Sequence, residues 1–120
     1  MECVPEYQPE YHCPVELAVD LVGGRWTPVI LAHLKQGELR YGQLRRLLPG
    51  ISEKMLTQRL RELERARLVE RTVHDEDAVV TVSYRLSAEG RELGPMLQAM
   101  YDWGERRAER DGVVISPLPR

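Results

Sequence analysis

The sequence is poor in cysteine and contains no long apolar run. Cys3 and Cys13 are the only thiols among 120 residues, too few for a disulfide framework. The three histidines, His12, His33 and His74, do not lie at metal-ligand spacings from them, so we expect no metal and no other cofactor. No apolar segment approaches the roughly 20 residues that cross a bilayer, and the acidic N-terminus is unlike a signal peptide. We therefore expect a cytoplasmic protein with no membrane partner.

The chain also lacks the usual sequence signs of an enzyme. It contains no glycine-rich phosphate-binding loop, no spaced pair of carboxylates in an apolar setting and no Ser/His/Asp set at recognisable positions. We therefore predict that the protein is not an enzyme. Its length and its 42% hydrophobic and 30% charged residues are those of one soluble domain with a small core.

Basic residues are not in overall excess, since the formal net charge is −2. They are concentrated in one part of the chain instead. Residues 40–71 hold nine Arg and Lys against four Glu, a balance of +5, whereas the other 88 residues hold eight basic and fifteen acidic residues, a balance of −7. A basic middle inside an acidic frame indicates a focused site for a polyanion such as nucleic acid.

Residues 50–67 are predicted to form an amphipathic helix that begins at Ser52, a favourable N-cap. At about 100° per residue, one face carries Leu56, Leu60 and Leu63. The opposite face carries long polar side chains, with a threonine at its edge: Lys54, Thr57, Gln58, Arg61 and Arg65. Two interpretations fit this stripe. It is either a solvated helix face or the reading face of a recognition helix, whose side chains reach base edges and phosphates in a major groove.

Periodicity and turn signals predict the other elements. In chain order they are an irregular arm at 1–12, helices at 13–22 and 25–35, a turn at 36–38, an extended link at 39–40 and a helix at 41–48. Residues 80–86 alternate as a half-buried strand does, and residues 69–74 are the expected partner strand, with Asp75, Glu76 and Asp77 near the hairpin tip. A final helix is expected from Ser87 to about Arg110, with a kink at Pro95.

The pattern consists of two short helices joined by a tight turn, of which the second is basic, and then a hairpin. This order of elements predicts a winged helix-turn-helix. The fold class is thus mainly α with a small β-hairpin (α+β). The domain is expected at 13–110, between the arm at 1–12 and a C-terminal tail at 111–120. The terminal helices carry apolar residues that either pack on the domain or form a dimer interface. These residues are Leu17, Leu21, Leu93, Met96, Leu97, Met100 and Trp103.

Pro14 directly after Cys13 indicates that the Cys13 sulfur lies at the N-terminus of the first helix. Free backbone N–H groups and the helix dipole at that position favour a thiolate. Such a thiolate would react with oxidants, with electrophiles such as quinones, or with a second thiol, either Cys3 or Cys13 of another copy. The alternative is a half-buried cysteine that only packs.

Four segments resemble HxlR-type (MarR-like) winged-helix transcriptional regulators: Cys13–Glu16, Gly23–Thr27, Pro49–Glu64 and Trp103–Glu105. The resemblance runs in order over about three quarters of the chain, and Pro49–Glu64 is its most specific part. It implies a homodimer that joins through its first and last helices and binds double-stranded DNA at two half-sites. It also implies that some members sense oxidants or electrophiles through the cysteine that matches Cys13.

On this reading, the recognition helix reads bases with Lys54, Thr57, Gln58 and Arg61. The residues expected to contact phosphates are Arg40, Arg45, Arg46, Arg59 and Arg65. For Arg59, a salt bridge within the domain is the equal alternative.

One segment departs from the family pattern, because the wing tip at 74–79 contains no Arg or Lys. Either this acidic tip lies clear of the duplex, or affinity is weaker and rests on the helix. Two alternative functions therefore remain open. One is a protein-interaction module without specific DNA binding, and the other is a regulator gated by a small aromatic ligand.

Overall fold

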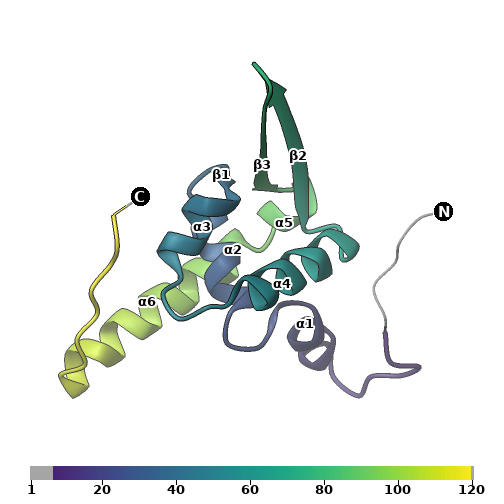
Figure 1. Ribbon diagram of the computed structural model, residues 1–120. Coiled ribbons are helices and arrows are strands. Elements are labelled where there is room, and N and C mark those ends of the chain that lie inside the picture. Colours follow the sequence, from purple (N-terminus) through teal and green to yellow (C-terminus); the bar gives the residue numbers. More distant parts are fainter. Residues whose placement is uncertain (1–6, 120) are drawn as a thin grey trace.

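The computed structural model describes residues 7–119, which form helices around a small core and one projecting hairpin (Figure 1). Cys3 and the first half of the predicted arm lie outside the described residues, whereas residues 7–12 form no helix or strand. The elements are α1 (Pro14–Val22), α2 (Thr27–Lys35), β1 (Leu39–Arg40), α3 (Tyr41–Leu47), α4 (Glu53–Arg65), β2 (Val69–Glu76), β3 (Val79–Leu86), α5 (Ala88–Arg91) and α6 (Gly94–Asp111).

Aliphatic side chains of α2, α3 and α4, mostly leucines, form the core. Ile30 and Leu31 of α2, Leu44 of α3 and Leu56 of α4 are completely buried. Their burial follows from the spacing of apolar residues every three or four positions, which puts them on one side of each helix. Leu97 attaches α6 to the same cluster. The apolar face predicted at Leu56, Leu60 and Leu63 is buried in this core, which holds α3 and α4 together as a helix-turn-helix.

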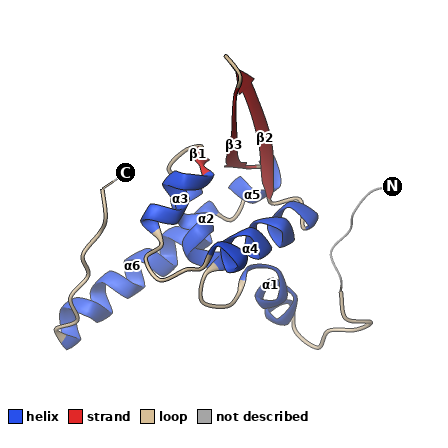
Figure 2. Ribbon diagram, in the orientation of Figure 1, coloured by secondary structure: helices blue, strands red, loops and turns tan. Residues whose placement is uncertain are grey.

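The three strands form one antiparallel sheet in the order β1-β3-β2. Leu39 of β1 pairs with Tyr84 of β3, and the β2–β3 pairing runs without interruption from Val69 opposite Leu86 to Glu76 opposite Val79. The hairpin leaves the helices and extends away from them (Figure 2). The winged helix-turn-helix predicted from the sequence is therefore confirmed.

The turn of the hairpin is tighter than the sequence indicated. Asp77 and Ala78 alone connect the strands, and both have positive φ values, 51° and 64°. A two-residue turn of this hand matches the twist of the flanking strands. The strands are consequently longer than predicted, and Asp75 and Glu76 belong to β2 rather than to a loop.

The prediction of one kinked helix from Ser87 to Arg110 is wrong. The structure has a short α5, then a turn at Glu92 and Leu93, and then α6, in which Pro95 occupies the first turn. Proline has no N–H for the carbonyl four residues earlier, and it disfavours helical geometry in the residue before it. Helix α5 therefore ends before Pro95, and α6 begins with it.

Gly90 of α5 allows the connection after the hairpin to pack closely. A Cβ at this position would meet the carbonyl oxygen of Leu68, the residue just before β2. The side chain of Ser87 caps α5 by accepting from the Gly90 N–H at 2.9 Å and donates to the Arg67 carbonyl at 2.7 Å. Within residues 7–119, no helix is both long and apolar enough to cross a membrane.

Candidate nucleic-acid interface

Helix α4 separates its apolar and polar side chains onto two faces. Leu56, Leu60 and Leu63 are at most 1% exposed and pack into the core. The other face borders an open groove of about 690 Å³, lined by Tyr41, Glu53, Lys54, Thr57, Gln58, Arg61, Glu62 and Arg65. All five residues predicted for the polar stripe of this helix line this one groove.

The N-terminus of α4 forms as predicted. Ser52 is the N-cap, and its side chain accepts a hydrogen bond of 3.0 Å from the Met55 N–H. The cap satisfies one of the N–H groups that the first turn leaves without a helical partner. Glu53 follows in the first turn and accepts from Arg45 of α3 at 2.9 Å. The cap determines where α4 begins, and the Arg45–Glu53 ion pair connects α4 to α3.

The three cations that line the groove have no carboxylate partner among the described residues. Lys54, Arg61 and Arg65 form no ion pair with any residue in the described part of the chain. Gln58 reaches Glu62 only at 3.4 Å, which is a weak hydrogen bond. Their donors are therefore available to a ligand in the groove, and a row of unpaired cations attracts a polyanion.

Arg59 lies apart from that row. Its guanidinium pairs with Glu62 at 2.6 Å, its Nε approaches the Met55 sulfur at 3.3 Å, and its side chain is only 28% exposed. The salt bridge within the domain, which the sequence left as an alternative for Arg59, is thus present in the structure.

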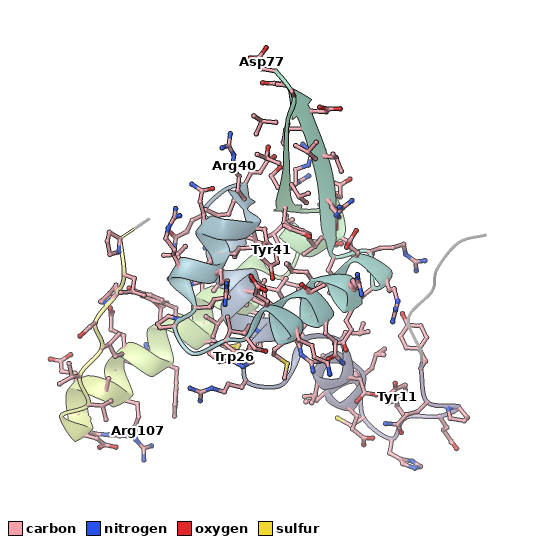
Figure 3. The ribbon with its side chains drawn as sticks, viewed as in Figure 1. Tyr11, Trp26, Arg40, Tyr41, Asp77 and Arg107 are labelled. Carbon is pink, nitrogen blue, oxygen red and sulfur yellow. The ribbon has the colours of Figure 1, made fainter. Side chains whose placement is uncertain are left out.

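The remaining arginines predicted to contact phosphates lie around the helix-turn-helix. Arg45 and Arg46 are exposed in the last turn of α3. Arg40 precedes α3 on the side of the wing (Figure 3). The Arg45–Glu53 pair is exposed, and such pairs contribute little to stability. Arg45 can therefore exchange its carboxylate partner for a phosphate at small cost.

Tyr41 is a residue of the groove that the sequence pattern did not reveal. Its hydroxyl donates to the Glu53 carbonyl oxygen at 3.2 Å and lies 3.2 Å from Thr57 Oγ1. Tyr41 begins α3, whereas the other two residues belong to α4, so the contact depends on how the helices cross. The one sequence signal for this contact with α4 is that a tyrosine stands at the start of α3, the first helix of the helix-turn-helix.

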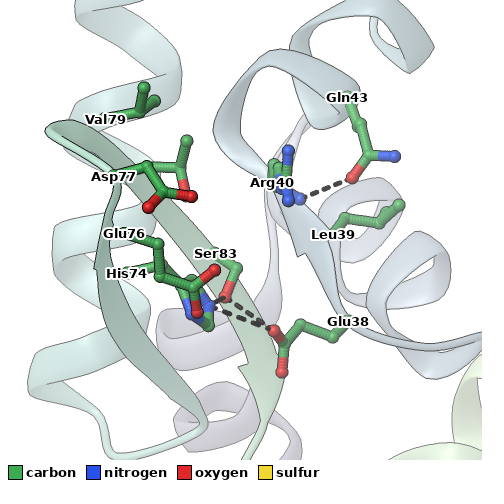
Figure 4. A pocket seen from close by; sticks show the side chains of 10 residues that line it. Glu38, Leu39, Arg40, Gln43, His74, Glu76, Asp77, Val79 and Ser83 are labelled. Carbon is green, nitrogen blue, oxygen red and sulfur yellow. Dashed lines mark hydrogen bonds and ion pairs between the residues drawn. The ribbon is translucent and has the colours of Figure 1, made fainter.

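A second cavity, of about 470 Å³, lies between the wing and the link that precedes α3 (Figure 4). At its floor, Ser83 of β3 donates to Glu38 Oε2 at 2.7 Å, and His74 Nε2 lies 2.9 Å from the Ser83 oxygen. These bonds connect the base of the wing to the α2–β1 link.

Tyr84 of β3 is buried in the same sheet. Burial raises the pKa of Tyr84 above its ordinary value, and a hydrogen bond from Arg71 partly offsets this increase.

The Glu38–Ser83–His74 cluster is not arranged as a nucleophile and its base. Ser83 donates its only proton to Glu38, so the His74 nitrogen that faces Ser83 must be a donor and not a proton acceptor. Ser83 is also only 2% exposed. A serine nucleophile needs the opposite arrangement, with an imidazole that accepts its proton and with access to substrate. The cluster is therefore a structural connection.

The tip of the wing is acidic in the structure as in the sequence. Asp77 lies at the far end of the hairpin (Figure 3), next to Asp75 and Glu76 at the end of β2, and all three are exposed. Val79 and Val80 complete this end of the wing. Negative charge at the tip opposes the approach of phosphates to this end of the wing.

The residues predicted for a dimer interface divide into two groups. Leu97 is buried in the core of its own chain, and Leu21, Leu93 and Met96 pack against that core. Met100 and Trp103 of α6 are 51% and 58% exposed, and Leu17 of α1 is half-buried. Val15 and Val19 of α1 are exposed as well, so both terminal helices keep apolar surface that the described chain does not cover.

Cys13 occupies the N-cap position of α1, as the sequence predicted. The thiol is free and exposed and makes no capping hydrogen bond. Nearby, Tyr11 donates to Asp20 at 2.7 Å. That hydrogen bond to a carboxylate raises the pKa of Tyr11.

The fold and the basic face of α4 together define a winged helix-turn-helix protein. Residues 21–112 match the HxlR-like helix-turn-helix family, and the chain belongs to that family of transcriptional regulators. It is 42% identical over 98 residues to the HTH-type transcriptional regulator YdeP of Bacillus subtilis (strain 168), covering 82% of this chain and 76% of YdeP.

Solved structures of two regulators are similar to this chain over most of its length. The oxidised form of the redox regulator HypR has a TM-score of 0.75 at 39% identity, over 78% of this chain and 96% of HypR. The reduced form of the transcriptional regulator YodB of B. subtilis has a TM-score of 0.68 at 38% identity, over 80% of this chain and 94% of YodB.

Proposed function

We propose that the protein is a homodimeric, sequence-specific DNA-binding regulator that reads two half-sites with α4. The observation that supports this most directly is the groove face of α4, where Lys54, Arg61 and Arg65 have no carboxylate partner among the described residues while the opposite face is buried. An α-helix of this width fits a major groove. Arg and Lys match guanine O6 and N7, and Gln58 matches adenine N6 and N7.

The roles of the side chains follow from their places on the helix. Lys54, Thr57, Gln58 and Arg61 lie in the N-terminal two thirds of α4 and are proposed to contact base edges. Arg65, in the last turn, and the exposed Arg40, Arg45 and Arg46 are proposed to contact phosphates, which determine register and orientation. Because the wing tip is acidic, affinity is proposed to rest on the helix-turn-helix.

Dimerisation is proposed because one helix of 13 residues offers few contacts. The exposed apolar surface of α1 and α6 is continuous with residues that already pack on the core. In a two-fold interface each such residue occurs twice. Two copies would place their α4 helices on half-sites about 34–36 Å apart, one turn of duplex.

We further propose that Cys13 makes this regulator responsive to oxidants or electrophiles. The thiol is exposed at the start of α1, and similar chains include the redox regulator HypR and the transcriptional regulator YodB. If α1 belongs to the dimer interface, a modification of Cys13 would tilt one α4 relative to the other. The half-site spacing would then no longer match.

Salt dependence of duplex binding tests the proposed function. Wild-type affinity for duplex DNA is expected to fall steeply between about 50 and 200 mM salt, because each phosphate contact releases counterions. Arg65→Ala is expected to lower the slope of log K against log salt by about one. Arg59→Ala is the matched control, since Arg59 already pairs with Glu62, and its slope is expected to stay that of the wild type.

The same measurement separates the alternatives. Absence of duplex binding, or binding that does not depend on salt, would contradict the proposal and favour a module that binds proteins. Equal slopes for Arg65→Ala and the wild type would remove Arg65 from the phosphate contacts. Release from DNA by a small aromatic compound in Cys13→Ser protein would indicate gating by a ligand rather than by thiol chemistry.

A further inference from the structure

Tyr41 connects the two helices of the helix-turn-helix through its hydroxyl group. Its ring packs against the core, and its hydroxyl bonds both the Glu53 carbonyl oxygen and Thr57 Oγ1, each at 3.2 Å. Tyr41, Glu53 and Thr57 all line the groove that is proposed to receive DNA. The state of this hydroxyl group therefore affects a residue expected to read bases.

The number of available protons determines the direction of both hydrogen bonds. A phenol has one proton, and a carbonyl oxygen can only accept. Tyr41 must therefore donate to Glu53, and Thr57 must donate its own proton to the Tyr41 oxygen. A threonine in a helix commonly donates to the carbonyl four residues earlier, which for Thr57 is that of Glu53. Tyr41 occupies this carbonyl instead and receives the Thr57 proton.

As a result, the Thr57 hydroxyl has only lone pairs left for the groove. In the major groove adenine presents an amino donor at N6 and cytosine one at N4, whereas guanine presents N7 and O6 and thymine presents O4, which are all acceptors. We propose that Tyr41 is a specificity-determining residue that holds Thr57 as a hydrogen-bond acceptor. The base that Thr57 reads is then adenine or cytosine. This inference rests on the proposed function, that α4 reads DNA.

Selection of bound sequences from a random duplex pool tests the inference. Thr57→Val removes the hydroxyl group and identifies the position that Thr57 reads as the one where preference is lost. Every base pair contains either adenine or cytosine, so the contact is tested with duplexes in which purine replaces adenine, or pyrimidin-2-one replaces cytosine, at that position. Loss of the amino donor is expected to weaken wild-type binding and to leave binding by Thr57→Val unchanged. In Tyr41→Phe the Thr57 proton is no longer held by Tyr41 and can pass to the Glu53 carbonyl or to a guanine or thymine acceptor, so the preference there is expected to fall, by at most about fivefold, the worth of one hydrogen bond.

Tyr101 provides the matched control for Tyr41. Tyr101→Phe removes the same hydroxyl group from an exposed position on α6 and is expected to leave the selected sequences unchanged. Wild-type binding that does not depend on the N6 or N4 amino group at the Thr57 position would overturn the inference. It would be overturned equally if Thr57→Val altered no position, or if Tyr41→Phe selected the wild-type sequences. No enrichment by the wild type would reject the proposed function as well.

A second measurement needs no DNA. The equilibrium constants of unfolding of the wild type, Tyr41→Phe, Thr57→Val and the double variant form a double-mutant cycle. The two hydroxyl groups are expected to be coupled by about fivefold, since each single change already breaks the bond between them. Strictly multiplicative effects would show that the hydroxyl groups do not interact and would overturn the inference. Phenylalanine keeps the ring that packs on the core, so these variants are expected to fold.

Discussion

Gln58 and Arg59 are adjacent in the sequence but have different surroundings. Gln58 lines the groove, and its hydrogen bond to Glu62 is long at 3.4 Å. Arg59 is turned about 100° around the helix and is held by Glu62 at 2.6 Å. One residue therefore offers its amide to a ligand, whereas the other completes an ion pair along the helix.

Gln58→Ala is expected to change which sequences the protein binds. The amide can bond adenine N6 and N7 together, and loss of such a pair costs about 1–3 kcal/mol at one base position. Binding of duplexes that differ at single positions measures this penalty. Unchanged affinity and unchanged preference in Gln58→Ala would contradict the proposed docking of α4.

Cys13→Ser is expected to remove the response to oxidants while leaving DNA binding in place. Cys13 is exposed at the N-cap of α1, and serine is itself a favourable N-cap residue. The variant should therefore fold like the wild type. The measurement compares release from a bound duplex by diamide or a quinone in both proteins. If both proteins are released equally, Cys13 is not the sensor.

At the scale of single elements, the wing contains a strained residue. Ala78 has a φ of 64° in the two-residue turn of the hairpin. Left-handed geometry costs an L-residue with a Cβ about 1–2 kcal/mol, and glycine is the residue usually found in such turns. Ala78→Gly is expected to raise the free energy of unfolding by roughly 0.5–1 kcal/mol, since added chain entropy in the unfolded state offsets part of the gain. Urea denaturation measures the change.

Ala99→Gly provides the control of opposite sign. Ala99 is exposed within α6, where helical geometry favours alanine over glycine by about 1 kcal/mol. This variant is expected to be less stable than the wild type. A loss of stability in Ala78→Gly similar to that of Ala99→Gly would show that the hairpin turn does not have the left-handed geometry described above.

At the scale of the whole molecule, the exposed apolar surface of α1 and α6 is the proposed dimer interface. Trp103→Glu places a charge on the exposed part of α6, and in a two-fold interface this charge occurs twice. The variant is expected to be monomeric in sedimentation at micromolar concentration, where the wild type is expected to be dimeric. Its affinity for a duplex with two half-sites should fall to that of a single half-site.

Val80→Glu is the matched control for the dimer. Val80 is as exposed as Trp103 but lies on the wing, near the tip of the hairpin. The same change in charge there is expected to leave sedimentation unchanged. A monomeric wild type would contradict the dimer, and a dimeric Trp103→Glu would exclude this part of α6 from the interface.

Much of the fold and part of the candidate site could be predicted because they depend on local spacing. The buried face at Leu56, Leu60 and Leu63 follows from the helical period. The start of α4 follows from Ser52, whose cap needs only the next three residues. The groove face of α4 was predictable for the same reason, since residues on one helix keep their relative directions wherever the helix packs.

Contacts between distant residues were decided only by the tertiary structure. The Tyr41–Thr57 bond depends on the crossing of two helices, and the Glu38–Ser83 bond joins residues 45 apart in the chain. The sequence also left Arg59 open between phosphate contact and salt bridge, because the partner it takes depends on the rotamers of several neighbouring side chains. The periodicity of the sequence therefore determined which face each helix turns inward. The packing of the helices determined which polar groups retain free protons and lone pairs on the outward face, because hydrogen bonds within the fold use up the others first.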